Sequence, residues 1–216
     1  YLKLFGMGIR KKGKFITFEG IEGSGKSTQI KLLKNFIEKK LKKKVFLTRE
    51  PGGTSISEKI RKLIINDLKD NHNPYAELYL IFAARALHFE VIKEKIDKGY
   101  FVLCDRYIDS TIAYQHYNGS IDLNFIKIMQ SKIHSNKLPN ITFLLDINPQ
   151  ISKQRLLKRG KKLDRFDKLS LKKMTLVRNG FLKIAKINKK RVVIVKNDIN
   201  KEVAHDLIVK NLLKKI

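Results

Sequence analysis

The chain has 216 residues, which is enough for one substantial domain and too few for two of ordinary size. Its formal net charge is +27 (47 Lys and Arg against 20 Asp and Glu), which would suit a nucleic-acid binder. No segment, however, interleaves basic residues with stacking aromatics. We therefore favour a lysine-rich solvated surface and expect no specific nucleic-acid partner. No apolar run approaches the roughly 18–20 residues of a membrane span, so no membrane partner is expected, and the single cysteine, Cys104, excludes an internal disulfide and suits a cytoplasmic location.

Short β-rich runs alternate with longer helical patterns along the chain, after a basic N-terminal extension at 1–13. Strands are predicted at 14–19, 44–49, 100–105, 141–147 and 191–196. Helices are predicted at 26–40, 55–69, 75–98, 122–134, 149–159, 166–188 and 201–215. This alternation is typical of βαβ units. We therefore predict a three-layer α/β fold, in which helices cover both faces of a five-stranded parallel sheet, as a single domain over 14–216.

The first predicted strand runs directly into a phosphate-binding motif. Residues 18–29 read FEGIEGSGKSTQ and fit G-x-x-x-x-G-K-[ST], the P-loop of nucleoside triphosphatases. Glycines let successive backbone N–H groups face the phosphates, and the following helix N-terminus adds a favourable dipole. Lys26 would reach the β- and γ-phosphates of ATP, and Ser27 would hold Mg²⁺. The proposed ATP phosphate-binding residues are Gly20, Glu22, Gly23, Ser24, Gly25, Lys26, Ser27 and Thr28.

Two further strands end in charged residues on the same edge of the sheet. Arg49 ends the second strand, before a Pro-Gly-Gly turn, and Asp105-Arg106 ends the third. Asp105 is the carboxylate expected to help hold Mg²⁺. Right-handed crossovers place all strand ends on one edge, so Arg49, Lys26 and Arg106 should converge there. Three cations exceed what one nucleotide needs, which favours a donor and an acceptor phosphate site, and hence a kinase rather than a hydrolase.

Five segments resemble those of thymidylate kinases, in the order and spacing of that family, over nearly the whole chain from Lys14 onward. They are FEGIEGSGKSTQ, TREPGGT, FAAR, DRYIDSTIAYQ and RGKKLDRF. The resemblance implies transfer of the γ-phosphoryl group of ATP to dTMP, giving dTDP for dTTP synthesis, with Mg²⁺ as cofactor and a homodimer built on helices. Another nucleoside monophosphate kinase and a basic nucleic-acid-binding ATPase remain alternatives.

The resemblance also implies roles in binding dTMP. Arg49 and Arg106 would clamp its phosphate, Glu22 would lie near the sugar, and Arg85 would hydrogen-bond the thymine edge. Tyr114 would pack against the deoxyribose. Phe82 precedes Arg85 by three residues where many relatives have four, so Phe82 and Ile81 compete for stacking on the base. The full set expected to bind dTMP is Glu22, Arg49, Pro51, Phe82, Arg85, Arg106, Ser110, Thr111, Tyr114 and Gln115.

A basic segment after the fourth strand is predicted to form a lid at about 155–166. Three arginines, Arg155, Arg159 and Arg165, surround a glycine there. The variable positions of the phosphate loop are not basic, and the resemblance implies that in such enzymes the lid supplies the missing charge. The expected catalytic residues are Lys26, Arg106, Arg155, Arg159 and Arg165. An acceptor phosphate needs little general base, so none of the five histidines is assigned a role.

Overall fold

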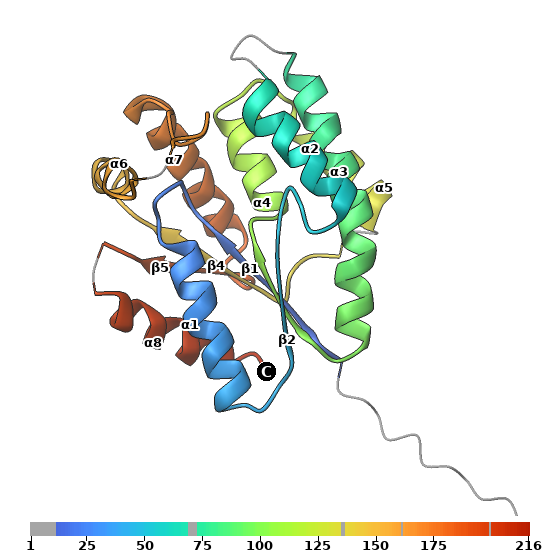
Figure 1. Ribbon diagram of the computed structural model, residues 1–216, viewed down its shortest axis with the longest axis vertical. Helices are drawn as coiled ribbons and strands as arrows, with labels where there is room; N and C mark the ends of the chain where they lie inside the picture. Colours follow the sequence, from blue (N-terminus) through green and yellow to red (C-terminus); the bar gives the residue numbers. More distant parts are fainter. Residues whose placement is uncertain (1–11, 69–72, 135–136, 161, 199) are drawn as a thin grey trace, which may run out of the picture.

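The computed structural model describes residues 12–68, 73–134, 137–160, 162–198 and 200–216 (Figure 1). The five strands are β1 (Lys14–Glu19), β2 (Val45–Arg49), β3 (Phe101–Asp105), β4 (Ile141–Asp146) and β5 (Val192–Lys196). They pair in parallel in the order β2-β3-β1-β4-β5, which confirms the predicted fold class. Most of the expected N-terminal extension lies outside the described residues, so the boundary at residue 13 stays a prediction.

The long helices agree with the sequence pattern apart from their ends. They are α1 (Lys26–Lys39), α2 (Ser55–Lys62), α3 (Pro74–Asp97), α5 (Leu123–His134), α6 (Pro149–Lys158), α7 (Leu171–Ile187) and α8 (Lys201–Leu213). Side-chain caps fix several starts: Thr54 precedes α2, Asn73 precedes α3 and Asn148 precedes α6, and each accepts a hydrogen bond from a backbone N–H of the first turn. No described helix has the length and apolar character needed to cross a bilayer.

Two of the predicted helices need correction, and one helical segment was not predicted. The helix predicted at 166–188 starts at Leu171, because Ser170 caps it and the preceding residues form a turn. The helix predicted at 55–69 changes at Leu63 into a π-helical turn, η1 (Leu63–Asp67). A helix that the sequence did not suggest, α4 (Ile108–Thr111), follows β3 and continues as the π-helical η2 (Ile112–Tyr117).

Helices cover both faces of the sheet (Figure 1). On one face, α1 and α8 pack on Phe18 and Phe143, with Leu33 and Ile208 among the buried contacts. On the other face α3 and α5 cover β1 and β3, and α7 covers β4 and β5. Burial on both faces explains the nearly continuous apolar runs of the strands.

The parallel register brings the functional strand ends to one level. Arg49 of β2 lies beside Asp105 of β3, which lies beside Phe18 of β1. Since all strands point the same way, the phosphate loop and the segments after β2, β3 and β4 leave the sheet at the same edge. The site is built there.

Candidate active site

A pocket of about 290 Å³ opens at the carboxyl edge of the sheet. Its walls come from the phosphate loop, the turn after β2, helices α2 and α3, the α4–η2 segment and the lid. Of the predicted residues, the pocket brings together Glu22, Gly23, Gly25, Lys26, Ser27, Arg49, Pro51, Arg85, Asp105, Arg106, Ser110, Thr111, Tyr114, Gln115 and Arg159. The predicted residues outside its lining are Gly20, Ser24, Thr28, Phe82, Arg155 and Arg165.

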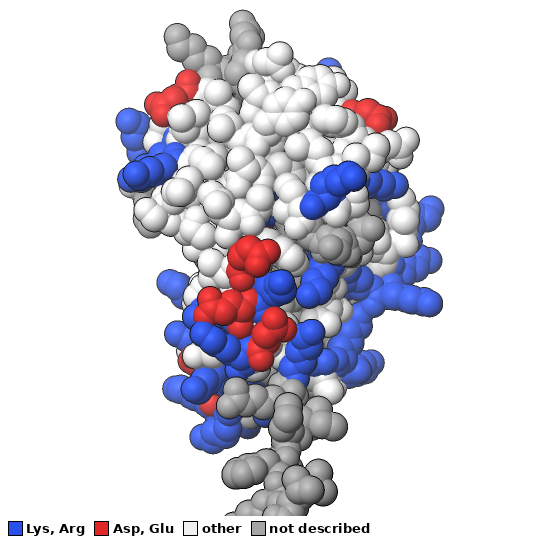
Figure 2. Space-filling model, turned by 90° about the vertical axis from the view of Figure 1, so that its right-hand side faces the viewer, with Lys and Arg blue, Asp and Glu red and all other residues white. Residues whose placement is uncertain are grey.

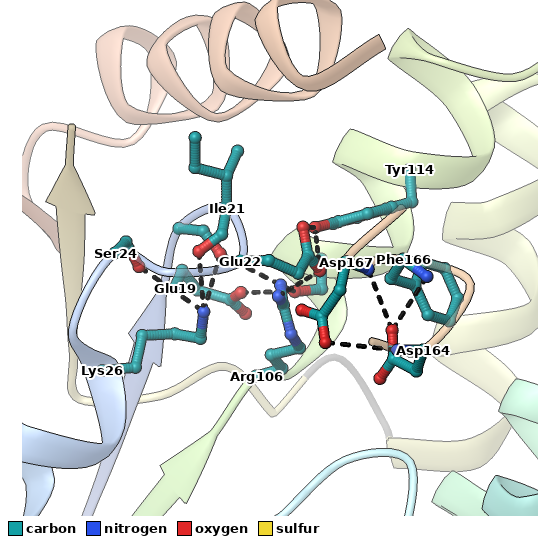
Figure 3. A network of polar contacts seen from close by, with 12 residues as sticks. Glu19, Ile21, Glu22, Ser24, Lys26, Arg106, Tyr114, Asp164, Phe166 and Asp167 are labelled. Atoms are coloured by element: carbon teal, nitrogen blue, oxygen red, sulfur yellow. Dashed lines mark hydrogen bonds and ion pairs between the residues drawn. The ribbon is translucent and has the colours of Figure 1, made fainter. Parts of the chain in front are cut away.

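The phosphate loop wraps around the amine of Lys26 (Figure 3). Lys26 Nζ donates to the carbonyl oxygens of Gly20 and Ile21, each at 3.0 Å. Burial, and next the charge of Arg106, lowers the pKa of Lys26 to about 8. Gly25 caps α1 with φ 88°, and a Cβ there would lie 2.4 Å from the amide nitrogen of Asn197, so this position requires glycine.

Ser27 and Asp105, the two residues expected to hold Mg²⁺, lie close together near the start of α1. Ser27 Oγ lies 3.4 Å from Asp105 Oδ2. Asp105 Oδ1 is buried and has no hydrogen-bond partner among the described residues. Among the described residues, no group of three or more His, Cys, Asp or Glu side chains is arranged so that it could hold a metal ion. The hydroxyl and carboxylate pair fits Mg²⁺, which uses few protein ligands and fills its shell with water and substrate phosphates.

Arg106 lines the pocket and lies in the middle of a network of polar contacts beside the phosphate loop (Figure 3). It adopts a left-handed backbone conformation with φ 70°, which turns its side chain toward the phosphate loop. Arg106 Nη1 donates to Gly20 O at 3.1 Å and to Ser110 Oγ at 3.0 Å, and Nη2 pairs with Glu22 Oε1 at 2.7 Å. Burial opposes its charge, but Tyr114, Glu22 and neighbouring carboxylates raise the pKa of Arg106, so it stays a cation.

Two more arginines face the same space. Arg49 forms a double contact with Glu58 of α2, at 3.2 and 2.7 Å. Arg61, also on α2, was not singled out from the sequence; it donates to Pro51 O at 3.1 Å and lines the pocket. Burial, followed by the charges of Arg49 and Arg106, lowers the pKa of Arg61. Both the burial of Arg61 and its repulsion by the two other arginines disfavour its charge, and an anion bound between them would offset both effects.

Arg85 of α3 also lines the pocket. Its guanidinium is 2% exposed and lies over the Phe82 ring at 5.1 Å. Phe82 itself is 1% exposed and belongs to the core, whereas Ile81 lines the pocket. Stacking of Phe82 on a base is therefore not supported, because its ring packs beneath Arg85.

The α4–η2 segment supplies the side wall. Tyr114 donates to both carboxylate oxygens of Glu22, at 2.6 and 2.7 Å, and its ring meets Phe166 of the lid edge-on at 5.6 Å between centroids. Gln115 Nε2 donates to Glu77 Oε1 of α3 at 3.0 Å. These contacts fix the orientation of the residues expected near the sugar and base.

The lid contributes unequally to the pocket. Asp164 Oδ1 accepts from the backbone nitrogens of Phe166 and Asp167, both at 2.9 Å, which closes a tight turn. Arg159 is exposed and lines the pocket. Arg165 instead pairs with Glu77 Oε2 at 2.6 Å, and Arg155 lies on α6 outside the lining. In this arrangement one of the three predicted arginines faces the pocket.

Glu19, at the end of β1, is a further residue that sequence reasoning missed. It is 1% exposed and accepts from Tyr107 N at 2.7 Å and from Ser110 Oγ at 2.6 Å. Burial, and next the charge of Asp109, raises the pKa of Glu19 to about 8. Through Ser110 it braces Arg106. In the sequence Glu19 lies inside the segment FEGIEGSGKSTQ, but before the first glycine of G-x-x-x-x-G-K-[ST], so the motif did not single it out.

The chain is similar to proteins of one family. A family model described as Thymidylate kinase matches residues 18–208. The thymidylate kinase of Sulfurihydrogenibium sp. (strain YO3AOP1) is 42% identical over 201 residues, covering 93% of this chain and 97% of that protein. That of Geotalea daltonii is 43% identical over 195 residues, covering 87% and 91%. The crystal structure of thymidylate kinase from Ehrlichia chaffeensis superposes with a TM-score of 0.73 at 33% identity, covering 93% and 99%.

Proposed function

Because the chain belongs to the thymidylate kinase family, we propose specific roles in phosphoryl transfer for the residues of its pocket. The chain is a dTMP kinase, an ATP-using transferase of dTTP biosynthesis that phosphorylates dTMP to dTDP. The proposals that follow concern which residues bind each substrate, the magnesium site and the assembly of the enzyme. A cytoplasmic location stays a prediction.

The phosphate loop is the proposed site for the donor phosphates. Its backbone N–H groups and the N-terminus of α1 favour anions. Lys26 would exchange its two carbonyl contacts for phosphate oxygens, and a negative neighbour would raise its lowered pKa. Ser27 and the unpartnered oxygen of Asp105 would hold Mg²⁺. When bound with ATP, magnesium neutralises charge on the phosphates during transfer.

The acceptor phosphate is proposed to lie between Arg49, Arg61 and Arg106. The convergence of these three arginines beside Lys26 is the observation that carries the proposal, since a single nucleotide does not need four cations. Two facing phosphate sites allow direct in-line transfer from ATP to dTMP without a covalent enzyme intermediate. Positioning and charge neutralisation then supply most of the catalysis.

The base and sugar of dTMP are proposed to lie between Arg85 and Tyr114. Arg85 Nη1 is buried and has no hydrogen-bond partner among the described residues, so it is a donor available to a thymine carbonyl. Ile81 of α3 offers an apolar surface to the base. The Tyr114 ring, held by Glu22 and Phe166, would crowd the 2′ position of the sugar.

A panel of acceptors assayed with ATP and Mg²⁺ tests these roles. We expect dTMP to have the highest kcat/KM, with dUMP weaker for want of the methyl contact, and dCMP and ribonucleotides poor. Cytosine would present an amino group to Arg85, so two hydrogen-bond donors would face each other without an acceptor. Such an unpaired buried group costs about 1–3 kcal/mol, which corresponds to a roughly tenfold to hundredfold lower kcat/KM. Arg85→Ala should reduce the ratio of kcat/KM for dTMP to that for dCMP. Tyr114→Ala should reduce the ratio of kcat/KM for dUMP to that for UMP.

The same assay separates the alternatives. If CMP or UMP were the best wild-type acceptor, the proposed roles of Arg85 and Tyr114 would be wrong. A nucleic-acid-binding ATPase would instead be stimulated by DNA or RNA and would not consume dTMP.

The enzyme is proposed to be a homodimer formed through α3. The exposed face of this helix runs Tyr79, Ala83, Leu87, with Tyr79 51% and Leu87 43% exposed. Figure 2, which shows the side on which α3 and α5 lie, has a broad area without charged side chains above a part where charges of both signs are mixed. An uncharged area on so basic a chain favours contact with a second copy.

Tyr79→Glu and Leu87→Glu are expected to convert the dimer to a monomer in light scattering after size exclusion. Both side chains are exposed, so folding should be little affected, whereas a charge buried in a dimer contact is costly. Ile187→Glu is the matched control, since Ile187 is 76% exposed on α7, and it should stay dimeric. A monomeric wild type would contradict the dimer.

A further inference from the structure

Arg85 is held on several sides by buried groups. Its Nε donates to Glu50 Oε2 at 2.6 Å and its Nη2 donates to Thr111 Oγ1 at 2.9 Å. The guanidinium also lies over the rings of Phe82 and Tyr107, at 5.1 and 5.3 Å. Only Nη1 lacks a partner among the described residues. The direction in which Nη1 points is therefore set by the groups that hold the other nitrogens.

Glu50 is in turn held by His88 of α3. Glu50 Oε1 lies 3.1 Å from His88 Nδ1, and His88 Nε2 lies 2.6 Å from Thr48 Oγ1. Burial alone would raise the pKa of Glu50, but Arg85 and His88 lower it, so Glu50 is an ionised carboxylate. A carboxylate only accepts hydrogen bonds, so the proton is assigned to His88 Nδ1, and Nε2 accepts from the Thr48 hydroxyl.

The turn after β2 packs directly on the imidazole ring. Gly53 has φ 86°, and a Cβ at this position would lie 2.2 Å from His88 Cδ2 and 2.8 Å from Thr48 Oγ1. His88 is 0% exposed and does not line the pocket. The turn thus confines the His88 ring on α3, and among the described residues of the pocket lining the ring is hydrogen-bonded to Glu50.

We propose that His88 is a positioning residue for base selection, which acts through Glu50 to fix the plane of the Arg85 guanidinium. The proposal rests on the proposed contact of Arg85 with the thymine edge. With both carboxylate oxygens of Glu50 occupied, the carboxylate cannot rotate, and Nη1 keeps one direction. Without the His88 bond, Glu50 and Arg85 can shift together, and Nη1 no longer distinguishes a carbonyl from an amino group.

Two substitutions of His88 separate its two hydrogen bonds. In His88→Asn the amide nitrogen takes the place of Nδ1 and can still donate to Glu50. In His88→Gln the amide lies farther out, near Nε2, so it can reach Thr48 but leaves Glu50 Oε1 without its donor. Both variants lose the ring, which makes them matched controls for packing. The measurements are kcat/KM for dTMP and dCMP, KM for ATP, and the melting temperature of each variant.

We expect His88→Gln to reduce the preference for dTMP over dCMP roughly tenfold or more, mainly through KM for dTMP, with KM for ATP unchanged. His88→Asn should keep most of the preference. A purely packing role would lower both melting temperatures and leave both preferences alike, which would overturn the inference.

Two further variants keep the test decisive. Glu50→Gln places an amide N–H₂ against a donor, either Arg85 Nε or His88 Nδ1. It should reduce the preference for dTMP over dCMP as His88→Gln does. An unchanged preference would overturn the inference even if the His88 variants failed to fold.

Arg85→Ala distinguishes failure of the proposed role of Arg85 from failure of the inference about His88. If it leaves the preference intact, the proposed role of Arg85 fails, and the inference fails with it. If it removes the preference while His88→Gln and Glu50→Gln do not, only the inference fails.

Discussion

Replacing Lys26 by alanine is expected to lower kcat by several orders of magnitude while the protein stays folded. Lys26 Nζ is the cation inside the phosphate loop, held 3.0 Å from two carbonyl oxygens and directed into the space proposed for the donor phosphates. A cation preorganised in a site of low dielectric stabilises developing charge far more than one in water does. The measurement is steady-state turnover of dTMP with ATP by the purified variant.

Lys31→Ala is the control for the Lys26 experiment, because Lys31 lies on the same helix and is exposed. It should match the wild type in both turnover and melting temperature. Circular dichroism of Lys26→Ala should show an intact fold, since Arg106 still donates to Gly20 O. Near-normal turnover of the Lys26 variant would contradict the assignment of the donor phosphate site to this loop.

Single replacements of the lid arginines should reveal at least one loss of about 10³-fold or more in kcat, the scale of an arginine finger. The phosphate loop offers no basic side chain at its variable positions, so charge at the transferred group has to come from elsewhere. Arg159 already lines the pocket, whereas Arg165 is paired with Glu77 and would have to exchange that partner to reach a phosphate. The measurement is kcat at saturating ATP and dTMP for Arg155→Ala, Arg159→Ala and Arg165→Ala.

Lys158→Ala is the matched control for the lid, since this exposed residue lies in the last turn of α6 beside Arg159. Its kcat should be unchanged. If all three arginine variants stayed within roughly tenfold of wild type, the lid would have no catalytic role in this enzyme.

The strands and the phosphate loop could be predicted because their constraints are local. A strand buried on both faces reads as an apolar run, as at 101–105 and 141–146, and a phosphate cradle demands glycines at fixed spacing. The α4–η2 segment could not be predicted in this way. Its β-branched and polar residues, such as Ile108 and Thr111, are weak helix formers, and tertiary contacts hold it, among them the Asp109–Arg191 ion pair at 2.7 Å.

The predicted site residues belong to motifs that carry chemistry, whereas Glu19 and His88, which were not predicted, act through partners that are distant in the sequence. Glu19 meets Ser110 across 91 positions of sequence, and His88 meets Glu50 across 38. Nothing in either local sequence announces such a pairing. For stacking on the base, the sequence left Phe82 and Ile81 as alternatives, because Phe82 precedes Arg85 by three residues rather than four. In the structure Phe82 is buried under Arg85 and Ile81 lines the pocket, an arrangement that depends on how α3 packs on the core.

The shared register of Arg49 and Asp105 bears on where the chain tolerates insertions and deletions. Adding or removing one residue within β3 would turn Asp105 and its neighbours to the opposite face of the sheet, because side chains alternate along a strand. The phosphate loop, braced against Arg106, would lose its partner in the same step. Residues 40–44, which connect α1 to β2, lie at the opposite edge of the sheet from the pocket, so a change in the length of this connection should affect the pocket far less than one within β3.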